Sequence, residues 1–141
     1  MTHIEEGDYA NTDTTELEVK FCWQTLQGNR KEVEKLYELD VKFSTININE
    51  SRGTALHVAV NEGNQSVVGR LVNSILFYGN VVALKTKNEK GDTPLHLAAS
   101  QGFQEICECI IGKNGERTYL NYIHNEKGET PLFLALLSWQ K

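Results

Sequence analysis

The chain has 141 residues, of which 40% are apolar and 23% charged, and its formal net charge is −5. This balance is typical of one globular domain, and the chain holds no run of about 18 apolar residues that could span a bilayer. Five of the 19 acidic residues lie in the first 16 positions, so the remaining 14 balance the 14 lysines and arginines. A neutral body argues against nucleic-acid binding, which usually needs a basic patch.

Residues 1–16 are acidic and contain no lysine or arginine. A secretion signal begins with basic residues and an apolar stretch, so the sequence predicts a cytoplasmic protein. We expect residues 1–16 to form a disordered acidic leader. The three cysteines are Cys22, Cys107 and Cys109, and their spacing is not that of a metal pair. We expect reduced packing residues and no metal.

Residues 17–41 have apolar side chains at helical spacing on both sides of Gly28 and Asn29. Charged residues between 30 and 38 supply a polar outer face. We interpret this segment as a degenerate copy of the unit that recurs downstream, capping its N-terminal end.

The strongest signal is repetition. The segment NEKGDTPLHLA at 88–98 recurs as NEKGETPLFLA at 125–135, and a looser copy, NESRGTALHVA, occupies 49–59. Thr93 and Thr130 precede a proline, which predicts a capped helix start, and Gly63 and Gly102 are suited to end the first helices. Apolar residues at spacings of three and four then predict second helices after each glycine.

The motif Thr-Pro-Leu-His at 93–96, followed by Gly102 and an apolar stripe from Ile106 to Ile110, resembles an ankyrin repeat. The resemblance runs from Leu17 to the C-terminus. It implies an all-α solenoid of stacked helix-turn-helix units with hairpin-like turns, with repeats from 49, 88 and 125, the last incomplete. The long connections and the sequence of residues 88–103 are most similar to those of plant ankyrin proteins of the accelerated-cell-death type. That narrower resemblance implies signalling or defence, with membrane attachment of the full-length protein through a C-terminal module.

Two features depart from the regular pattern. Arg52 stands where the other copies have Gly91 and Gly128, so we expect that hairpin tip to differ in shape or to store strain. The connections 76–87 and 112–124 are long, and their apolar centres predict packed segments rather than slack loops.

His57 and His96 are the tempting catalytic candidates. They occupy one motif position, however, and the resemblance implies that this histidine braces the hairpin by hydrogen bonding near the threonine. No nucleophile elbow, HExxH motif or phosphate loop occurs. We therefore expect no enzymatic activity and no cofactor, against the alternative of a hydrolase that uses one of these histidines.

The resemblance implies that a protein partner docks on the concave face, made by the hairpin tips and the exposed ends of the first helices. The matching positions are Glu50, Ser51, Asn61, Glu62, Lys87, Glu89, Lys90, Asp92, Ser100, Gln101, Glu126, Lys127 and Glu129. The leading hypothesis is a non-enzymatic protein-protein interaction module. The alternative is a self-associating scaffold, because the apolar helix expected at 131–139 is not followed by a second helix. We expect either that the natural protein continues or that this end joins copies.

Overall fold

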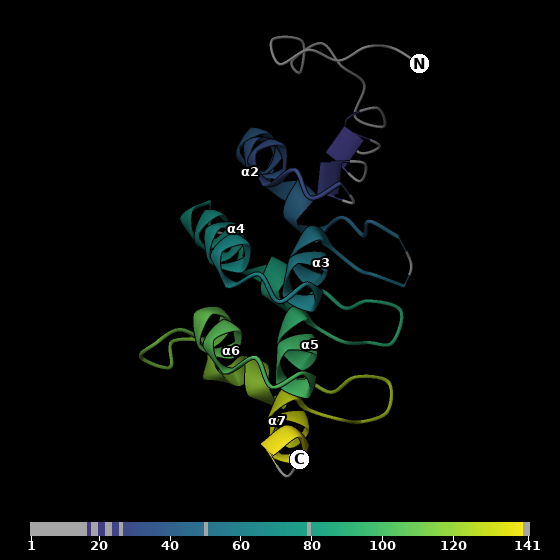
Figure 1. The fold of residues 1–141 in the computed structure, drawn as a ribbon, viewed down its shortest axis with the longest axis vertical. Helices are drawn as coiled ribbons and strands as arrows, with labels where there is room; N and C mark the ends of the chain where they lie inside the picture. Colours follow the sequence, from purple (N-terminus) through teal and green to yellow (C-terminus); the bar gives the residue numbers. More distant parts are fainter. Residues whose placement is uncertain are drawn as a thin grey trace.

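A computed structural model describes residues 17, 20–21, 24–25, 27–49, 51–78 and 80–139. The predicted leader at 1–16 lies outside the described residues. Within them the chain is helical apart from its loops, and the only β-type pairing is the isolated bridge between Asn49 and Gly53. Figure 1 shows helices stacked in layers along one axis, with hairpin loops projecting from one side. This arrangement is the predicted all-α solenoid.

The helices form two columns (Figure 1). The first helices of successive repeats are α3 (Ala55–Asn61), α5 (Pro94–Ser100) and α7 (Pro131–Trp139), and each packs on the next. The second helices are α2 (Arg30–Leu39), α4 (Gln65–Phe77) and α6 (Gln104–Ile111), which pack in the same way. Leu17, Phe21 and Thr25 are helical and buried ahead of α2. Helices α3 and α4, and likewise α5 and α6, also pack on each other, so each pair is held both internally and by the neighbouring layers.

The first helices begin where the threonines predict. Thr54 and Thr93 have extended backbones, and each side-chain oxygen accepts from the backbone N–H of the histidine three residues later. Pro94 occupies the first turn of α5, where no internal amide partner is needed. Gly63 and Gly102 follow the helix ends with φ of 72° and 74°, a conformation that glycine adopts without strain.

The second helices bury one apolar stripe each. In α4 the buried residues are Val68, Leu71, Val72 and Ile75, and in α6 they are Ile106 and Ile110. Cys107 and Cys109 are free and half-buried, and burial raises the pKa of the Cys107 thiol to about 11. A thiol that stays protonated suits the predicted packing role. Cys22 lies outside the described residues.

The long connections are packed, as predicted. They contain the short 3-10 helices η3 (Val81–Lys85) and η4 (Thr118–Tyr122), which bury Ala83, Leu84 and Leu120. A third one, η2 (Val41–Thr45), was not predicted, and it places Phe43 against Phe21 with the ring centroids 5.2 Å apart. None of the helices in the described part of the chain has the length and apolarity needed to cross a membrane.

Candidate partner-binding surface

The hairpins of the third and fourth repeats have equivalent geometry. The backbone N–H of Asn88 donates to the Asp92 carbonyl, and that of Asn125 donates to the Glu129 carbonyl, both at 2.9 Å. The side-chain oxygen of Asn88 accepts from the amides of Lys90 and Asp92 at 2.9 and 3.0 Å. Asn125 makes the same two bonds one repeat later. Each asparagine therefore holds its own tip in a fixed turn.

The hairpin of the second repeat differs in shape, as Arg52 predicts. Its backbone hydrogen bond runs from Gly53 N–H to the Asn49 carbonyl, four residues back. In the third repeat the equivalent bond, from Gly91 to Asn88, spans three residues, so the turn at Gly53 contains one more residue. The positive φ moves to Gly53, at 82°, and no non-glycine residue in the described ranges has a positive φ. The expected alternative, strain stored at Arg52, is therefore not observed.

His57 and His96 brace the hairpins, and the bracing reaches further than expected. The backbone N–H of Thr54 donates to Nδ1 of His57 at 3.1 Å, so the ring proton must be on Nε2. Nε2 then donates to the carbonyl of Asp92, in the next hairpin, at 2.8 Å. His96 repeats the pattern, with the Glu129 carbonyl at 2.9 Å. Each histidine thus joins two successive repeats.

Both rings are held neutral. The two histidines have no exposed surface, and burial lowers their pKa below the ordinary value. Hydrogen bonds to the Asp92 and Glu129 carbonyls oppose this shift without cancelling it. Both ring nitrogens of each buried histidine are hydrogen-bonded, which is the predicted bracing role.

Further contacts join the third and fourth tips. The ammonium of Lys87 donates to the carbonyl of His124 at 3.0 Å, and the side-chain amide of Asn125 donates to an Asp92 oxygen at 2.8 Å. The backbone N–H of Glu126 donates to the Lys90 carbonyl at 3.1 Å. These bonds fix the two tips relative to each other, so a partner would meet one preformed surface.

Ten of the predicted partner-binding residues are exposed: Ser51, Asn61, Glu62, Lys87, Glu89, Lys90, Ser100, Gln101, Glu126 and Lys127. Asp92 and Glu129 are half-buried, and Glu50 lies outside the described residues. At the ends of the first helices, the Gln101 side-chain amide donates to the Asn61 oxygen at 3.2 Å. The structure therefore places the set in two groups, the tips and the helix ends. Sequence reasoning did not foresee that Lys87 and Asp92 also bond to the next hairpin.

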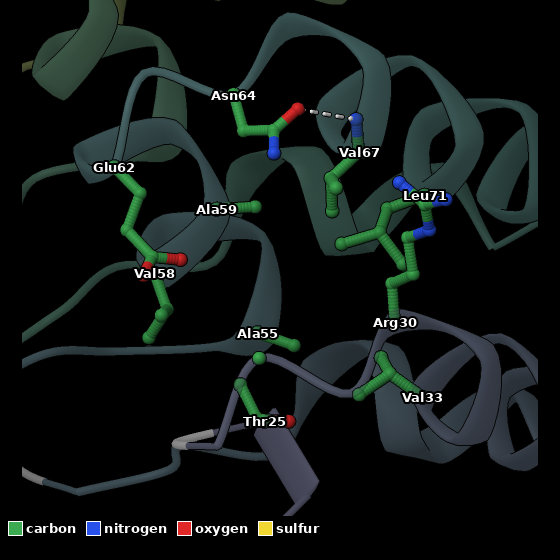
Figure 2. Close-up of a pocket in the computed structure, with 11 residues that line it drawn as sticks. Thr25, Arg30, Val33, Ala55, Val58, Ala59, Glu62, Asn64, Val67 and Leu71 are labelled. Atoms are coloured by element: carbon green, nitrogen blue, oxygen red, sulfur yellow. Dashed lines mark hydrogen bonds between the residues drawn. The ribbon is translucent and has the colours of Figure 1, made fainter.

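A pocket that the sequence analysis did not identify lies between the first two helix pairs (Figure 2). Its volume is about 240 Å³. Val33, Val58 and Leu71 form part of its buried wall, and Arg30 and Glu62 lie at its exposed rim. The sequence signal that could have revealed it is that Val58 and Val67 of the second repeat are smaller than the equivalent Leu97 and Ile106 of the third. No group of three potential metal ligands occurs in the described residues.

Comparison with known proteins decides the family. A family model of three ankyrin repeats matches residues 69–140, and the model of a single ankyrin repeat matches residues 53–80. The chain belongs to the ankyrin-repeat family. The histidines therefore brace successive ankyrin hairpins, and the pocket lies where residues 25–33, ahead of the matched ranges, meet the first matched repeat.

Two curated relatives are similar over most of this chain. The protein phosphatase 1 regulatory subunits 27 of Homo sapiens and Mus musculus are each 33% identical over 104 residues, which cover 74% of this chain. The match covers 63% of each relative, so this ankyrin chain spans less than two thirds of their length.

A solved structure has a similar fold. A chain in the crystal structure of the yeast ribosomal protein Rps3 in complex with its chaperone Yar1 aligns with a TM-score of 0.68. The alignment covers 92% of this chain and 89% of that chain, at 20% sequence identity. At this identity the likeness shows the fold alone. Together with the ankyrin family and the regulatory-subunit relatives, the fold supports a protein-protein interaction module.

Proposed function

We propose that this ankyrin stack is a non-enzymatic adaptor that binds a protein partner on the concave face. The observation that carries the proposal is the pair of tips joined at 88–92 and 125–129, whose exposed side chains stand on a backbone fixed by hydrogen bonds. A surface that is already ordered loses little conformational entropy on binding, which favours affinity. Two relatives are named as regulatory subunits of a phosphatase, and a regulatory subunit acts by binding rather than by catalysis.

The charges on the tips favour a partner of matching pattern. Glu89 and Lys90 alternate in sign on one tip, and Glu126 and Lys127 repeat the pattern on the next, all four exposed. A mixed pattern gives specificity through complementarity and little attraction at long range. We therefore expect a partner that offers alternating charges of its own.

The test is affinity capture with the four tip charges reversed together: Glu89→Lys, Lys90→Glu, Glu126→Lys and Lys127→Glu. A matched control reverses two acids and two lysines that are also exposed but lie on the outer column and its loops: Lys31→Glu, Glu105→Lys, Glu108→Lys and Lys113→Glu. Both variants keep the net charge. We expect the tip variant to lose partner recovery at least tenfold, and the control to retain it. Equal recovery with both would overturn the mapped surface.

We also propose a cytoplasmic location. The resemblance of residues 88–103 to the accelerated-cell-death type supports a role in plant signalling or defence, at the cytosolic face of a membrane in the full-length protein. The residues encoded after Lys141 test that narrower proposal, because a pair of apolar spans there would support it. A continuation without such spans would contradict membrane attachment through this module.

Self-association through α7 is the second candidate function. Helix α7 exposes Leu132, Phe133, Leu136, Leu137 and Trp139, with 41% to 69% of each side chain accessible. Such a contiguous apolar face favours contact with another molecule. Light scattering over a range of concentrations tests it, with Leu136→Glu as the comparison variant. A dimer that dissociates into monomers in the Leu136→Glu variant would support self-association. A monomer at every concentration would contradict it.

A further inference from the structure

The pocket between the first and second repeats corresponds to a junction that recurs one repeat later with larger side chains. Aligning Thr54 with Thr93 pairs each lining residue of the second repeat with its equivalent in the third. The third repeat has a larger or more apolar residue in four of these seven pairs, which are Ala55 with Pro94, Val58 with Leu97, Asn64 with Phe103, and Val67 with Ile106. The residues of the other three pairs, Ala59 with Ala98, Glu62 with Gln101 and Leu71 with Ile110, are similar in size.

The largest difference is a missing phenyl ring. At the junction of the second and third repeats, the Phe103 ring packs on Gly63, where an added Cβ would lie 3.2 Å from its Cζ. Gly28 is the equivalent glycine one repeat earlier, and an added Cβ there would have none of the described residues' atoms within 4 Å. The space beside Gly28 thus corresponds to the space beside Gly63 that the Phe103 ring occupies. The ring does not close the later junction completely, because a hollow of about 290 Å³ remains beside Gly63 and Phe103.

Asn64 has another task. Its side-chain oxygen accepts from the backbone N–H of Val67 at 3.1 Å, capping α4, and Figure 2 shows this bond at the edge of the pocket. Phe103 makes no such bond at the start of α6. The second repeat thus has a helix cap where the third repeat has an aromatic residue, and the cap does not fill the pocket.

The remaining surface of the pocket suits an aromatic side chain on an extended segment. The walls formed by Val33, Val58 and Leu71 are apolar and buried. A cavity of about 150 Å³ with apolar walls already accepts benzene, so about 240 Å³ leaves room for a phenyl ring and its methylene. At the rim, Arg30 carries donors and Glu62 carries acceptors. These groups are suited to the backbone C=O and N–H that flank a bound side chain.

We propose that this pocket binds a phenylalanine side chain presented by an extended segment of the protein partner. The inserted ring takes the place that Phe103 occupies at the following junction. The inference rests on the proposed function, because Glu62 belongs to the partner-binding face and the pocket opens beside it. The pocket supplies an apolar anchor, which the charged tips lack, and buried aromatic anchors contribute much of the energy of protein interfaces.

The first experiment uses N-acetyl-phenylalaninamide as the probe in a ¹H–¹⁵N NMR titration of the full chain. We expect saturable shifts at the backbone amides of Gly28, Ala59 and Asn64, with a Kd of about 1 mM, typical of a small fragment. N-acetyl-alaninamide should bind at least fivefold more weakly, since it offers no ring. The absence of saturable shifts, or equal binding of the two amides, would overturn the proposal.

Filling the pocket supplies the matched variants. Val58→Leu with Val67→Ile introduces the side chains of the third repeat, and should weaken probe binding at least fivefold. The reciprocal pair, Leu97→Val with Ile106→Val, makes the opposite exchange at the next junction and should leave the shifts around Gly28 unchanged. If the filled variant does not fold, Asn64→Phe tests the same point with the ring supplied in place. Undiminished binding by a folded, filled variant would overturn the proposal.

The two proposals fail separately. The variant with four reversed tip charges should bind N-acetyl-phenylalaninamide as the unmodified chain does, because the tips lie outside the pocket lining. Filling the pocket should also reduce capture of the protein partner. Capture that survives the filling would overturn the pocket as a docking site and leave the proposal about the tips standing. Lost capture with reversed tips and intact probe binding would support both.

Discussion

Helices α5 and α7 begin with the same Thr-Pro-Leu sequence but have different surroundings. Helix α5 packs between α3 and α7, and its Leu95 is 1% exposed. The equivalent Leu132 of α7 is 43% exposed. In both helices the capping threonine side chain accepts from the backbone N–H of the third helical residue. In α7 this bond runs from Phe133 N–H to Thr130 Oγ1 at 3.2 Å. The motif thus specifies where a helix begins, whereas the neighbouring layers decide how much of it is buried.

The two helices differ most at their third residue. His96 of α5 reaches the Glu129 carbonyl in the next hairpin, while Phe133 of α7 stands at the same position and is 46% exposed. The cap is therefore a local feature of the sequence, and the brace requires a following hairpin. Substitutions at these two positions separate the contributions.

The largest effect is expected for His96→Ala compared with Phe133→Ala. Removing the His96 ring leaves the Thr93 N–H without its partner, takes one of two donors from the Glu129 carbonyl and opens a cavity, which should cost about 2–4 kcal/mol. Phe133→Ala should cost less than about 1 kcal/mol, because much of that ring is already in water. Urea unfolding followed by circular dichroism measures both. Equal losses would show that the brace does not distinguish the two helices.

A smaller effect is expected at the hairpin tips that lead into these helices. Gly91 and Gly128 have nearly the same φ, 78° and 77°. A Cβ on Gly91 would lie 2.8 Å from the backbone nitrogen of Glu126, whereas one on Gly128 would have no atom of the described part of the chain within 4 Å. Each alanine should cost about 1 kcal/mol for the left-handed backbone, and Gly91→Ala about 1–3 kcal/mol more for the clash.

Thermal unfolding of the two alanine variants measures that difference. Both alanines carry the same penalty for a left-handed backbone. The difference in stability between the two variants therefore measures the contact between the third and fourth tips. A Gly91→Ala variant as stable as Gly128→Ala would mean that the tips are not held together in solution.

The third prediction concerns pH and carries the smallest effect. Histidines in the unfolded chain titrate near pH 6.5, while burial lowers the pKa of His57 and His96 in the folded chain. Protons therefore bind the unfolded state more readily, so the stability from the neutral rings is complete above about pH 6.5 and decreases as the pH falls. The urea concentration at the unfolding midpoint should decrease as the pH is lowered from 7.5 to 5.5. The His96→Gln variant should show a weaker dependence of this midpoint on pH. A midpoint that rises on acidification would contradict the neutral braces.

Much of the fold could be predicted because its signals are local. Thr93, Pro94 and Gly102 mark the start and end of α5 through their own backbone preferences, and the repeated wording places the other helices. The contacts between layers could not be predicted, because they depend on which residues the stacking brings together. The bond from Lys87 to the His124 carbonyl is one such contact, and the pocket is another.

The partner-binding residues divide in the same way. The motif predicted which positions lie on the tips and helix ends, since each repeat reproduces that placement. It gave no sign that the Asp92 carboxylate bonds to Asn125, because this bond exists only between two hairpins at the distance set by stacking. Their role in binding stays a prediction.

The most direct test of the account is the protonation of the two motif histidines in solution. Long-range ¹H–¹⁵N NMR of the imidazole rings at neutral pH distinguishes the tautomers. We expect His57 and His96 each to carry the proton on Nε2, and that proton to exchange slowly because it bonds the next hairpin. A proton on Nδ1, or rapid exchange of the Nε2 proton, would contradict a stack joined layer to layer by these rings.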